Sequence, residues 1–295
     1  MKSHIVIFGM GDMGSALASL LRKNRHAVDA WDKSPGRVSN QKSLFEIIPR
    51  AEIIFLCVPS WCLPSVTRSI RSFVHKNTII VGLSKGLQDD NKKTAYEFLS
   101  GTFPENPVLI LGGAMLANEL QKGMPGFGVL AGKNASVRER VAELFHGSPL
   151  TLTTSTDVVG VALSGVLKNI YAIGLGMAKG LDWGDNARAW FVFEAMHEME
   201  AVVKLSGGKK ESVYGVAGMI DLIATGFSAY SKNVEVGMMI VKNKKGIPQA
   251  EGVISLEPLS KILKSDLNKF PLLRAIYRTA THKEDPLLAF KRLLK

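Results

Sequence analysis

The stretch from Asp157 to Asn186 constrains the fold most, because it is long, strongly apolar and free of proline, yet carries a lysine and an asparagine side by side. Asp157 is a suitable N-cap, and Gly180 and Gly184 provide the stop and the turn. The helix between them would be roughly 35 Å long. Its internal polar residues and glycines argue against a membrane span. The sequence therefore predicts a buried core helix.

One face of this helix combines small residues with two polar side chains. Positions three and four apart are neighbours on a helix, so this face consists of Ser164, Gly165, Lys168, Asn169, Ala172 and Gly176. We expect a groove floored by small side chains, into which Lys168 and Asn169 project toward a ligand. The alternative is a buried helix whose lysine extends to water. The helix alone does not decide between the two.

A glycine-rich turn near the N-terminus predicts a dinucleotide-binding fold. The β-branched run His4–Phe8 leads into Gly-Met-Gly-Asp-Met-Gly at residues 9–14, and a helical pattern follows. In this motif the first glycine makes the tight turn, the second admits the pyrophosphate, and the third lets helix and strand pack closely. The expected cofactor contacts here are Gly9, Gly11, Asp12, Met13 and Gly14.

The residues after the second predicted strand bear on the choice of cofactor. This strand, Ala27–Trp31, ends at Asp32, which lies 18 residues beyond Gly14. In dinucleotide-binding folds, the acid that holds the ribose 2′-hydroxyl is expected roughly 20 residues beyond the glycine motif. A carboxylate repels a 2′-phosphate and favours NAD, whereas Lys33 and Arg37 favour NADP. We expect NAD, with NADP as the alternative.

Further apolar runs predict a parallel sheet with ligands at its carboxyl edge. They cover residues 52–58, 78–83 and 108–111, and residues 127–131 and 150–154 read as closing strands. Pro59 and Lys85 each follow one of these runs. We expect an α/β fold: an N-terminal Rossmann-type doubly wound sheet over residues 1–154, followed by an all-α C-terminal domain over residues 155–295.

Composition narrows the function classes. The net charge is +11, but lysines and arginines are scattered, and no zinc-ligand spacing or aromatic-basic RNA motif is present. We therefore expect no nucleic-acid partner and no metal. Attraction of anionic small ligands explains the charge, and so does a solvated basic surface. Two cysteines and no secretory signal favour the cytoplasm, without stable membrane insertion.

The stretch 157–186 resembles the catalytic helix of the NAD(P)-dependent glycerol-3-phosphate dehydrogenases, whose pattern is close to DVxGVExxGxLKNxxAIxxGxxxGLxxGDN. Ala162 replaces the glutamate. Ser84-Lys85-Gly86 is similar to the family's SKG motif, and the segment AGMIDLIATGFSAYSKN resembles AGxGDLxxTCxSxxSRN. The resemblance implies interconversion of sn-glycerol 3-phosphate and dihydroxyacetone phosphate, a phosphorylated small-molecule substrate, a homodimer and a role in glycerophospholipid biosynthesis.

The same resemblance implies the site residues. Lys168 is the general acid/base, with Lys85, Asn169 and Asp221 as its catalytic partners. The substrate-binding residues are Lys85, Gly113, Met115, Lys168, Asp221, Thr225, Ser231, Lys232 and Asn233. Beyond the glycine-rich turn and Asp32, the cofactor-binding residues are Pro59, Lys85, Ala117, Lys232 and Glu251.

Several departures from the family pattern fall on substrate contacts. The family's GPSxAxE segment has a serine where this chain has Met115, and a thioether cannot donate a hydrogen bond. Lys232 replaces an arginine and loses the bidentate fork. The family's insertion between Asp32 and the third strand is missing. Two alternatives therefore remain: a related dehydrogenase of the hydroxyacid or 6-phosphogluconate type, and a non-catalytic dinucleotide-binding paralogue.

Overall fold

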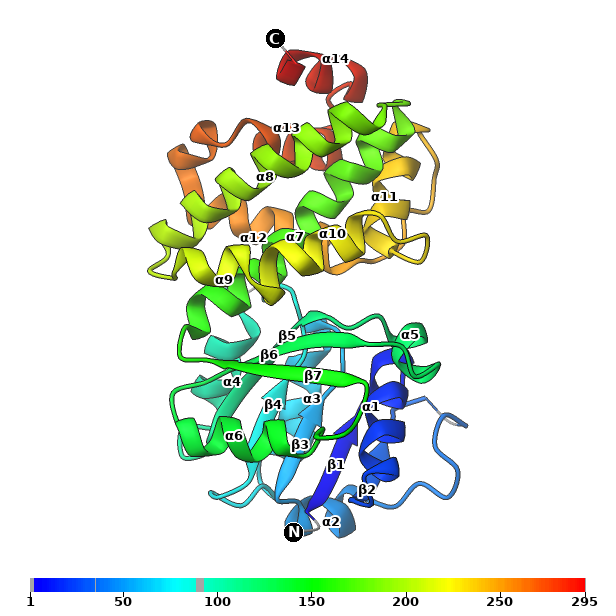
Figure 1. Ribbon diagram of the computed structural model, residues 1–295, viewed down its shortest axis with the longest axis vertical. Helices are drawn as coiled ribbons and strands as arrows, with labels where there is room; N and C mark the ends of the chain where they lie inside the picture. Colours follow the sequence, from blue (N-terminus) through cyan, green and yellow to red (C-terminus); the bar gives the residue numbers. More distant parts are fainter. Residues whose placement is uncertain (1–2, 35, 89–92, 295) are drawn as a thin grey trace. The chain divides into compact units, whose positions relative to one another are not determined.

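The computed structural model describes residues 3–34, 36–88 and 93–294 (Figure 1). The chain divides into two compact units, Met1–Ser84 with Ala95–Val158, and Lys85–Thr94 with Val159–Lys295. The sequence pattern places residues 85–94 in the first domain, whereas they belong to the second unit. Leu87 explains this, because its side chain is buried in the helical core and its N–H donates to Ser255 Oγ at 3.0 Å.

The first unit is built on a seven-stranded sheet of order β2-β1-β3-β4-β5-β6-β7. Its strands are β1 (His4–Phe8), β2 (Ala27–Trp31), β3 (Ile53–Leu56), β4 (Ile79–Gly82), β5 (Val108–Ala114), β6 (Gly126–Ala131) and β7 (Leu150–Ser155). Neighbouring strands are parallel except β5 and β6. This confirms the predicted Rossmann-type sheet, and all seven strands lie where the apolar runs predict them, within a few residues.

Both faces of the sheet are covered, which explains why its strands read as continuous apolar runs. On one face, Ile5 and Ile7 of β1 share a buried cluster with α1 (Asp12–Lys23), α5 (Ala117–Gln121) and α6 (Ala135–Glu143). On the other face lie α2 (Leu44–Ile47), α3 (Leu63–Ile70) and α4 (Ala95–Thr102), as Figure 1 shows. A Cβ built at Gly82 on β4 would lie 2.7 Å from a methyl of Leu99 on α4, so helix and strand are in close contact.

The strand order reverses between β1 and β3. β1 has β2 on one side and β3 on the other, so the strand order runs outward from β1 in both directions. In open α/β sheets the crevice outside the carboxyl ends of such strands is where ligands bind. The glycine-rich turn follows β1, and Pro59 follows β3 after a short link, so both belong to this switch point.

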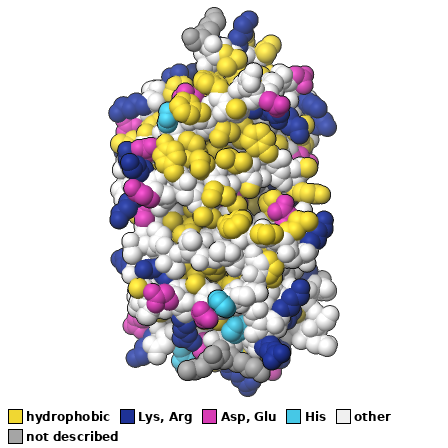
Figure 2. Space-filling model, viewed as in Figure 1, with side chains coloured by type: hydrophobic (Ala, Val, Ile, Leu, Met, Phe, Trp, Pro, Cys, Tyr) yellow, Lys and Arg dark blue, Asp and Glu magenta, His cyan; other side chains and the backbone are white. Residues whose placement is uncertain are grey.

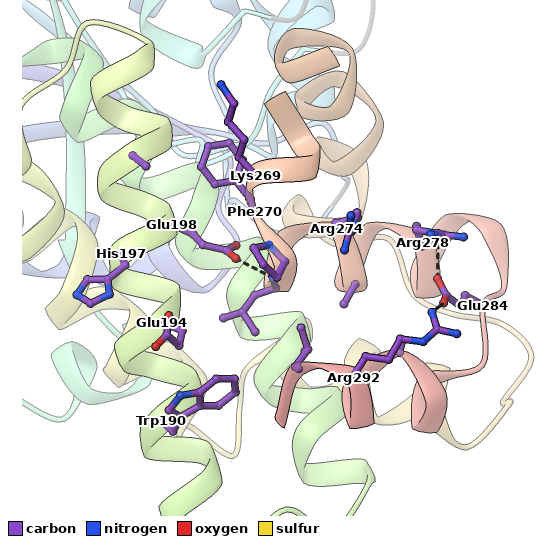
Figure 3. Close-up of a pocket in the computed structure, with 16 residues that line it drawn as sticks. Trp190, Glu194, His197, Glu198, Lys269, Phe270, Arg274, Arg278, Glu284 and Arg292 are labelled. Atoms are coloured by element: carbon purple, nitrogen blue, oxygen red, sulfur yellow. Dashed lines mark hydrogen bonds and ion pairs between the residues drawn. The ribbon is translucent and has the colours of Figure 1, made fainter. Parts of the chain in front are cut away.

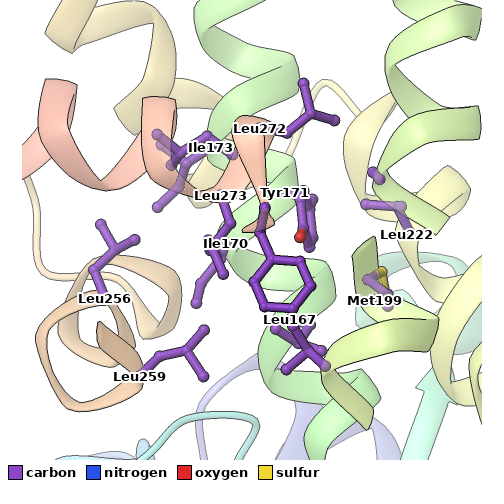
Figure 4. Close-up of a cluster of buried hydrophobic side chains, with 14 of the residues drawn as sticks. Leu167, Ile170, Tyr171, Ile173, Met199, Leu222, Leu256, Leu259, Leu272 and Leu273 are labelled. Atoms are coloured by element: carbon purple, nitrogen blue, oxygen red, sulfur yellow. The ribbon is translucent and has the colours of Figure 1, made fainter. Parts of the chain in front are cut away.

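The second unit is built from helices around α7 (Val158–Gly180). The others are α8 (Asp185–Leu205), α9 (Lys210–Tyr214), α10 (Asp221–Gly226), α11 (Lys232–Val241), α12 (Glu251–Leu263), α13 (Pro271–His282) and α14 (Pro286–Lys291), with a π-helical turn at Val216–Ile220. Leu167, Ile170 and Tyr171 of α7 lie at the centre of the apolar core, among leucines of α10, α12 and α13 (Figure 4).

The bounds of α7 match the sequence pattern, because Asp157 directly precedes its first residue and Gly180 is its last. In the described part of the chain this helix alone is long and apolar enough to cross a membrane, and 94% of its apolar window is buried. Burial of this kind is expected of a core helix. The apolar stretch is thus explained by the core of the second unit.

The glycines of α7 serve helix packing. A Cβ built at Gly176 would lie 2.1 Å from the carbonyl oxygen of Val234 on α11, and one built at Gly237 would lie 2.0 Å from the carbonyl oxygen of Ile173. The backbones of α7 and α11 therefore meet without side chains between them. The expected groove is wrong over this part of the face, because α11 fills it. A Cβ at Gly165 would instead meet the side-chain stem of Lys85 at 3.5 Å.

Candidate functional site

The glycine-rich turn has the geometry that a dinucleotide requires. Gly9 adopts a φ of +86°, and a Cβ there would lie 2.6 Å from the carbonyl oxygen of Cys57, just after β3. A Cβ at Gly14 would lie 1.9 Å from the carbonyl oxygen of Gly9. Neither position accepts a larger residue, and α1 begins at Asp12 directly behind the turn. The free N–H groups of its first turn favour a pyrophosphate.

The other cofactor residues predicted in the first unit lie around the same edge of the sheet. Gly11, Asp12 and Met13 form the turn and the start of α1, and Pro59 precedes the short helical turn after β3. Ala117 begins α5, and Gln121 of α5 approaches the carbonyl oxygen of Asp12 at 3.4 Å. These residues fit NAD(P) as the cofactor.

Two lysines and one aspartate form a buried ionic cluster in the second unit. Asp221 lies where the π-helical turn ends and α10 begins, a local irregularity that often marks functional positions. Its carboxylate contacts Lys85 Nζ at 2.6 Å and Lys168 Nζ at 3.0 Å. Lys168 Nζ also donates to Thr225 Oγ1 at 2.8 Å, and that hydroxyl lies 3.1 Å from Asp221. Four of the predicted site residues thus form one network.

This network sets the protonation of Lys168. Burial lowers the pKa of Lys168 to about 8; the attraction of Asp221 opposes the shift, and the charge of Lys85 adds to it. Burial alone would raise the pKa of Asp221, but the two ammonium groups hold it below its ordinary value. Lys168 can therefore exchange a proton near neutral pH, as a general acid or base must, while Asp221 stays ionised.

A chain of amides supports the cluster. Asn169 Nδ2 donates to the carbonyl oxygen of Lys85 at 2.9 Å, and Asn233 Nδ2 donates to Asn169 Oδ1 at 2.9 Å. Asn233 Oδ1 in turn accepts from the N–H of Gly252 at 3.2 Å. The start of α12, where Glu251 lies, is thereby linked to α7 and α11. Gly252 directly follows the predicted cofactor residue Glu251, but its contact with Asn233 was not predicted from the sequence.

The remaining predicted residues lie outside this network. Ser231 caps α11 by accepting from the N–H of Val234 at 3.3 Å, and Lys232 is exposed in the first turn of that helix. Gly113 lies in β5 of the first unit, and Met115 is only 5% exposed in the apolar core of that unit. Their predicted contacts with substrate or cofactor stay predictions.

A cavity elsewhere in the second unit does not coincide with these residues. It has a volume of about 470 Å³ and is bordered by α8, α13 and α14 (Figure 3). Its buried carboxylate, Glu198, accepts from the N–H groups of Leu272 and Leu273 at 2.7 and 2.9 Å and from Tyr171 Oη at 2.9 Å. Burial raises the pKa of Glu198 despite these bonds. Because this carboxylate anchors α13, we read it as structural.

No cluster of metal-ligating side chains occurs within residues 3–34, 36–88 and 93–294.

Comparison with known proteins agrees with this geometry. Residues 33–138 match the family model of the NAD-dependent glycerol-3-phosphate dehydrogenase N-terminus, and residues 157–291 match that of the C-terminus. The chain is 31% identical to glycerol-3-phosphate dehydrogenase [NAD(P)+] of Acaryochloris marina, over 98% of this chain and 94% of that one. It is 28% identical to the enzyme of the same name from Clostridium acetobutylicum, over 96% and 94%.

A solved structure extends the likeness to three dimensions. Glycerol-3-phosphate dehydrogenase from Coxiella burnetii superimposes with a TM-score of 0.91 at 26% identity, covering 100% of this chain and 99% of that one. Both family models, a curated relative above 30% identity and the folded architecture thus agree. The chain belongs to the NAD-dependent glycerol-3-phosphate dehydrogenase family.

Proposed function

We propose that this protein is an NAD(P)-dependent oxidoreductase that interconverts sn-glycerol 3-phosphate and dihydroxyacetone phosphate. The observation that carries the proposal is the buried contact of Lys168 with Asp221, within a chain of this family. Lys168 is 6% exposed, and burial lowers its pKa to about 8, so it can exchange a proton near neutral pH. It suits a reaction in which an oxygen gains or loses a proton.

Lys168 acts as the general acid in ketone reduction. A nicotinamide cofactor, when bound, would supply the hydride that reduces the ketone carbon. Negative charge then develops on the carbonyl oxygen, and the Lys168 ammonium stabilises it and donates the proton. In alcohol oxidation Lys168 accepts this proton instead. Asp221 holds the amine in place and favours its charged form, and Thr225 holds it from a second direction.

Substrate binding rests on Lys85 and Lys232 in the second unit. Lys85 retains 21% side-chain exposure beside the buried pair, so its ammonium can contact a substrate oxygen while Asp221 balances its charge. Lys232 is exposed at the start of α11 and is a suitable partner for a phosphate. Asn233 is 8% exposed and bonded to Asn169, so we assign it to positioning.

The test is oxidation of reduced nicotinamide by dihydroxyacetone phosphate, followed by absorbance. Purified protein is assayed with NADH and with NADPH beside Lys168→Met, which keeps the length and apolar stem of the side chain. Turnover that falls by at least about three orders of magnitude in the variant supports the proposal. Turnover that persists in the variant removes Lys168 from the chemistry.

The two rival activities are separated by adding other substrates to this assay. A dehydrogenase of the hydroxyacid or 6-phosphogluconate type would bind NAD(P)H, leave dihydroxyacetone phosphate unreduced, and oxidise a hydroxyacid or a sugar acid phosphate with NAD(P)+. A non-catalytic paralogue would bind cofactor and oxidise nothing. Retention of Lys85, Lys168 and Asp221 in one ionic network argues against the second rival, because a protein without turnover has no use for it.

The oligomeric state and the cellular location are inferred from the family. We propose a homodimer in the cytoplasm that supplies glycerol phosphate for lipid synthesis. The second unit exposes Ile223 of α10, together with Ile220 just before that helix and Phe227 just after it, and Arg188 of α8 lies over the Phe227 ring. Figure 2 shows hydrophobic side chains gathered over this region. Light scattering gives the mass, and Phe227→Asp weakens the dimer if this face is used.

A further inference from the structure

The cavity between α8, α13 and α14 has the size and the mixed lining of a small-molecule site. Its volume of about 470 Å³ lies within the range of roughly 300–1,000 Å³ that is usual for ligand pockets. Part of its wall is apolar, because Phe270, Leu272 and Ala289 line it and are almost fully buried. Lys168 and Asp221 do not line it. The reaction proposed above therefore leaves this cavity without a role.

The wall formed by α13 and α14 carries an excess of positive charge. Glu284 lies between these two helices, and its carboxylate contacts Arg278 Nε at 2.9 Å and Arg292 Nη1 at 2.7 Å (Figure 3). One carboxylate thus balances two guanidinium groups, and one positive charge remains. Each guanidinium has five N–H donors in all, so both keep donors beyond those that contact Glu284.

Arg274 adds a second positive charge to this wall. It lies one helical turn before Arg278 on α13, lines the cavity and is half-buried. Within residues 3–34, 36–88 and 93–294, its guanidinium has no carboxylate partner within 4.0 Å. Guanidinium groups match the geometry of carboxylates and are weakly hydrated. A half-buried Arg274 without a counter-ion is therefore suited to an anionic ligand.

The opposite wall, on α8, differs in character. Trp190, Glu194 and His197 recur at helical spacing and line the cavity. The Trp190 indole extends from α8 toward α14 and offers a flat apolar surface (Figure 3). The carboxylate of Glu194 disfavours a second negative charge on this side. A bound molecule would thus direct its anionic group toward α13 and its apolar body toward Trp190.

We propose that this cavity binds a small aromatic carboxylate, whose carboxylate contacts Arg274 and whose ring lies against Trp190. Charge-assisted hydrogen bonds to the guanidinium and burial of the ring supply the affinity. The site goes beyond the proposed function and does not depend on it, because its lining residues are separate from those assigned to the reaction and to the cofactor.

The first experiment compares three probes by calorimetry on the purified protein: 4-phenylbutanoate, 4-phenylbutan-1-ol and butanoate. The alcohol keeps the ring and lacks the charge, whereas butanoate keeps the charge and lacks the ring. We expect 4-phenylbutanoate to bind about 10- to 100-fold more tightly than either of the others. If the alcohol or butanoate binds as tightly as 4-phenylbutanoate, the inference is overturned.

Variants locate the binding site. Arg274→Gln should bring 4-phenylbutanoate to within about threefold of the alcohol, and the alcohol should bind as it does to the wild type. Trp190→Leu should weaken 4-phenylbutanoate about 10-fold and leave butanoate unchanged. Arg71→Gln is the matched control, because Arg71 is exposed at the end of α3 in the first unit. Preference for the acid that survives Arg274→Gln, or that Arg71→Gln removes, places the carboxylate elsewhere and overturns the inference.

The inference and the proposed function fail separately. Reduction of dihydroxyacetone phosphate without preferential binding of 4-phenylbutanoate supports the proposed function and overturns the inference. Binding of 4-phenylbutanoate that depends on Arg274, without turnover of dihydroxyacetone phosphate by either cofactor, supports the inference and overturns the proposed substrate.

Discussion

Replacement of Asp221 by asparagine tests whether this carboxylate sets the protonation of Lys168. The variant is nearly isosteric, but it takes from the ammonium groups of Lys168 and Lys85 the carboxylate that contacts both of them. Loss of a negative neighbour disfavours the charged form of an amine, so the pKa of Lys168 must fall. The reaction that needs a protonated lysine should then be confined to lower pH.

The size of the effect follows from the distance between the charges. At an effective dielectric constant of about 20, charges 3.0 Å apart attract by about 5 kcal/mol. This corresponds to on the order of 4 pKa units, and we expect at least about 2 after water enters the site. The pKa of Lys168 would thus move from about 8 to about 6 or lower. At about pH 7.5 the protonated fraction falls ~25-fold.

The assay is the pH dependence of kcat/KM for dihydroxyacetone phosphate reduction. We expect the high-pH limb to shift by at least about 2 units toward acid, with activity partly restored at about pH 5.5. Asp266→Asn is the control, because that aspartate is paired with Lys269 at a surface position. A loss of activity that is the same at every pH, with the limb still near 8, would refute the electrostatic role.

Instability of the variant has its own control. Removing one partner of a buried ion pair costs about 3–5 kcal/mol, so circular dichroism and thermal unfolding accompany the assay. The double variant Asp221→Asn/Lys85→Gln also removes the second ammonium group. It should be more stable than the single variant, and its pH limb should lie between those of the single variant and the wild type.

Three further predictions concern pH and packing. In the wild type, kcat/KM for ketone reduction should be at its maximum below the Lys168 pKa of about 8 and fall above it. The kcat/KM for alcohol oxidation should rise through the same pH range. Parallel profiles for the two directions contradict the role of Lys168 as general acid and base. Glu198→Ala should leave the N–H groups at the start of α13 unsatisfied and destabilise folding by about 1–3 kcal/mol for each, with kcat/KM unchanged, which thermal unfolding and kinetics check. Gly176→Ala should lower the midpoint of thermal unfolding, because overpacking costs about 1–3 kcal/mol. Gly101→Ala, at an exposed position of α4 with open space around it, should not lower it. Equal effects of the two substitutions would show that α11 moves to make room.

Much of the fold follows from local pattern. The apolar runs predicted the strands because residues buried on both faces of a sheet leave no polar alternation. The glycines of residues 9–14 predicted the dinucleotide turn because the motif gives each a steric role: the tight turn, the approach of the pyrophosphate, or close packing of helix and strand. α7 was predictable to within a residue at each end, since Asp157 and Gly180 are strong boundary signals.

The role of the site residues needed long-range contacts. Asp221 and Lys85 are 136 positions apart in the sequence, and no periodicity relates them. Taken alone, Asp221 is an acid on a short helix; the contact with the ammonium groups of Lys168 and Lys85 makes it a candidate partner in catalysis. The resemblance to the family indicated these residues as a group. Which of their atoms contact one another, and the lowered pKa of Lys168, depend on burial and distance.

Asp32 and Gly176 show the same difference between what the sequence predicts and what tertiary packing decides. Position along the chain made Asp32 a candidate for the ribose, whereas the fold directs its oxygens to the N–H groups of Met10 and Ser34. Spacing on α7 placed Gly176 on a ligand face, whereas the fold packs the backbone of α11 against it. Sequence period encodes which side of an element a residue occupies. What occupies the space opposite that residue depends on segments far away in the chain, and only their packing decides it.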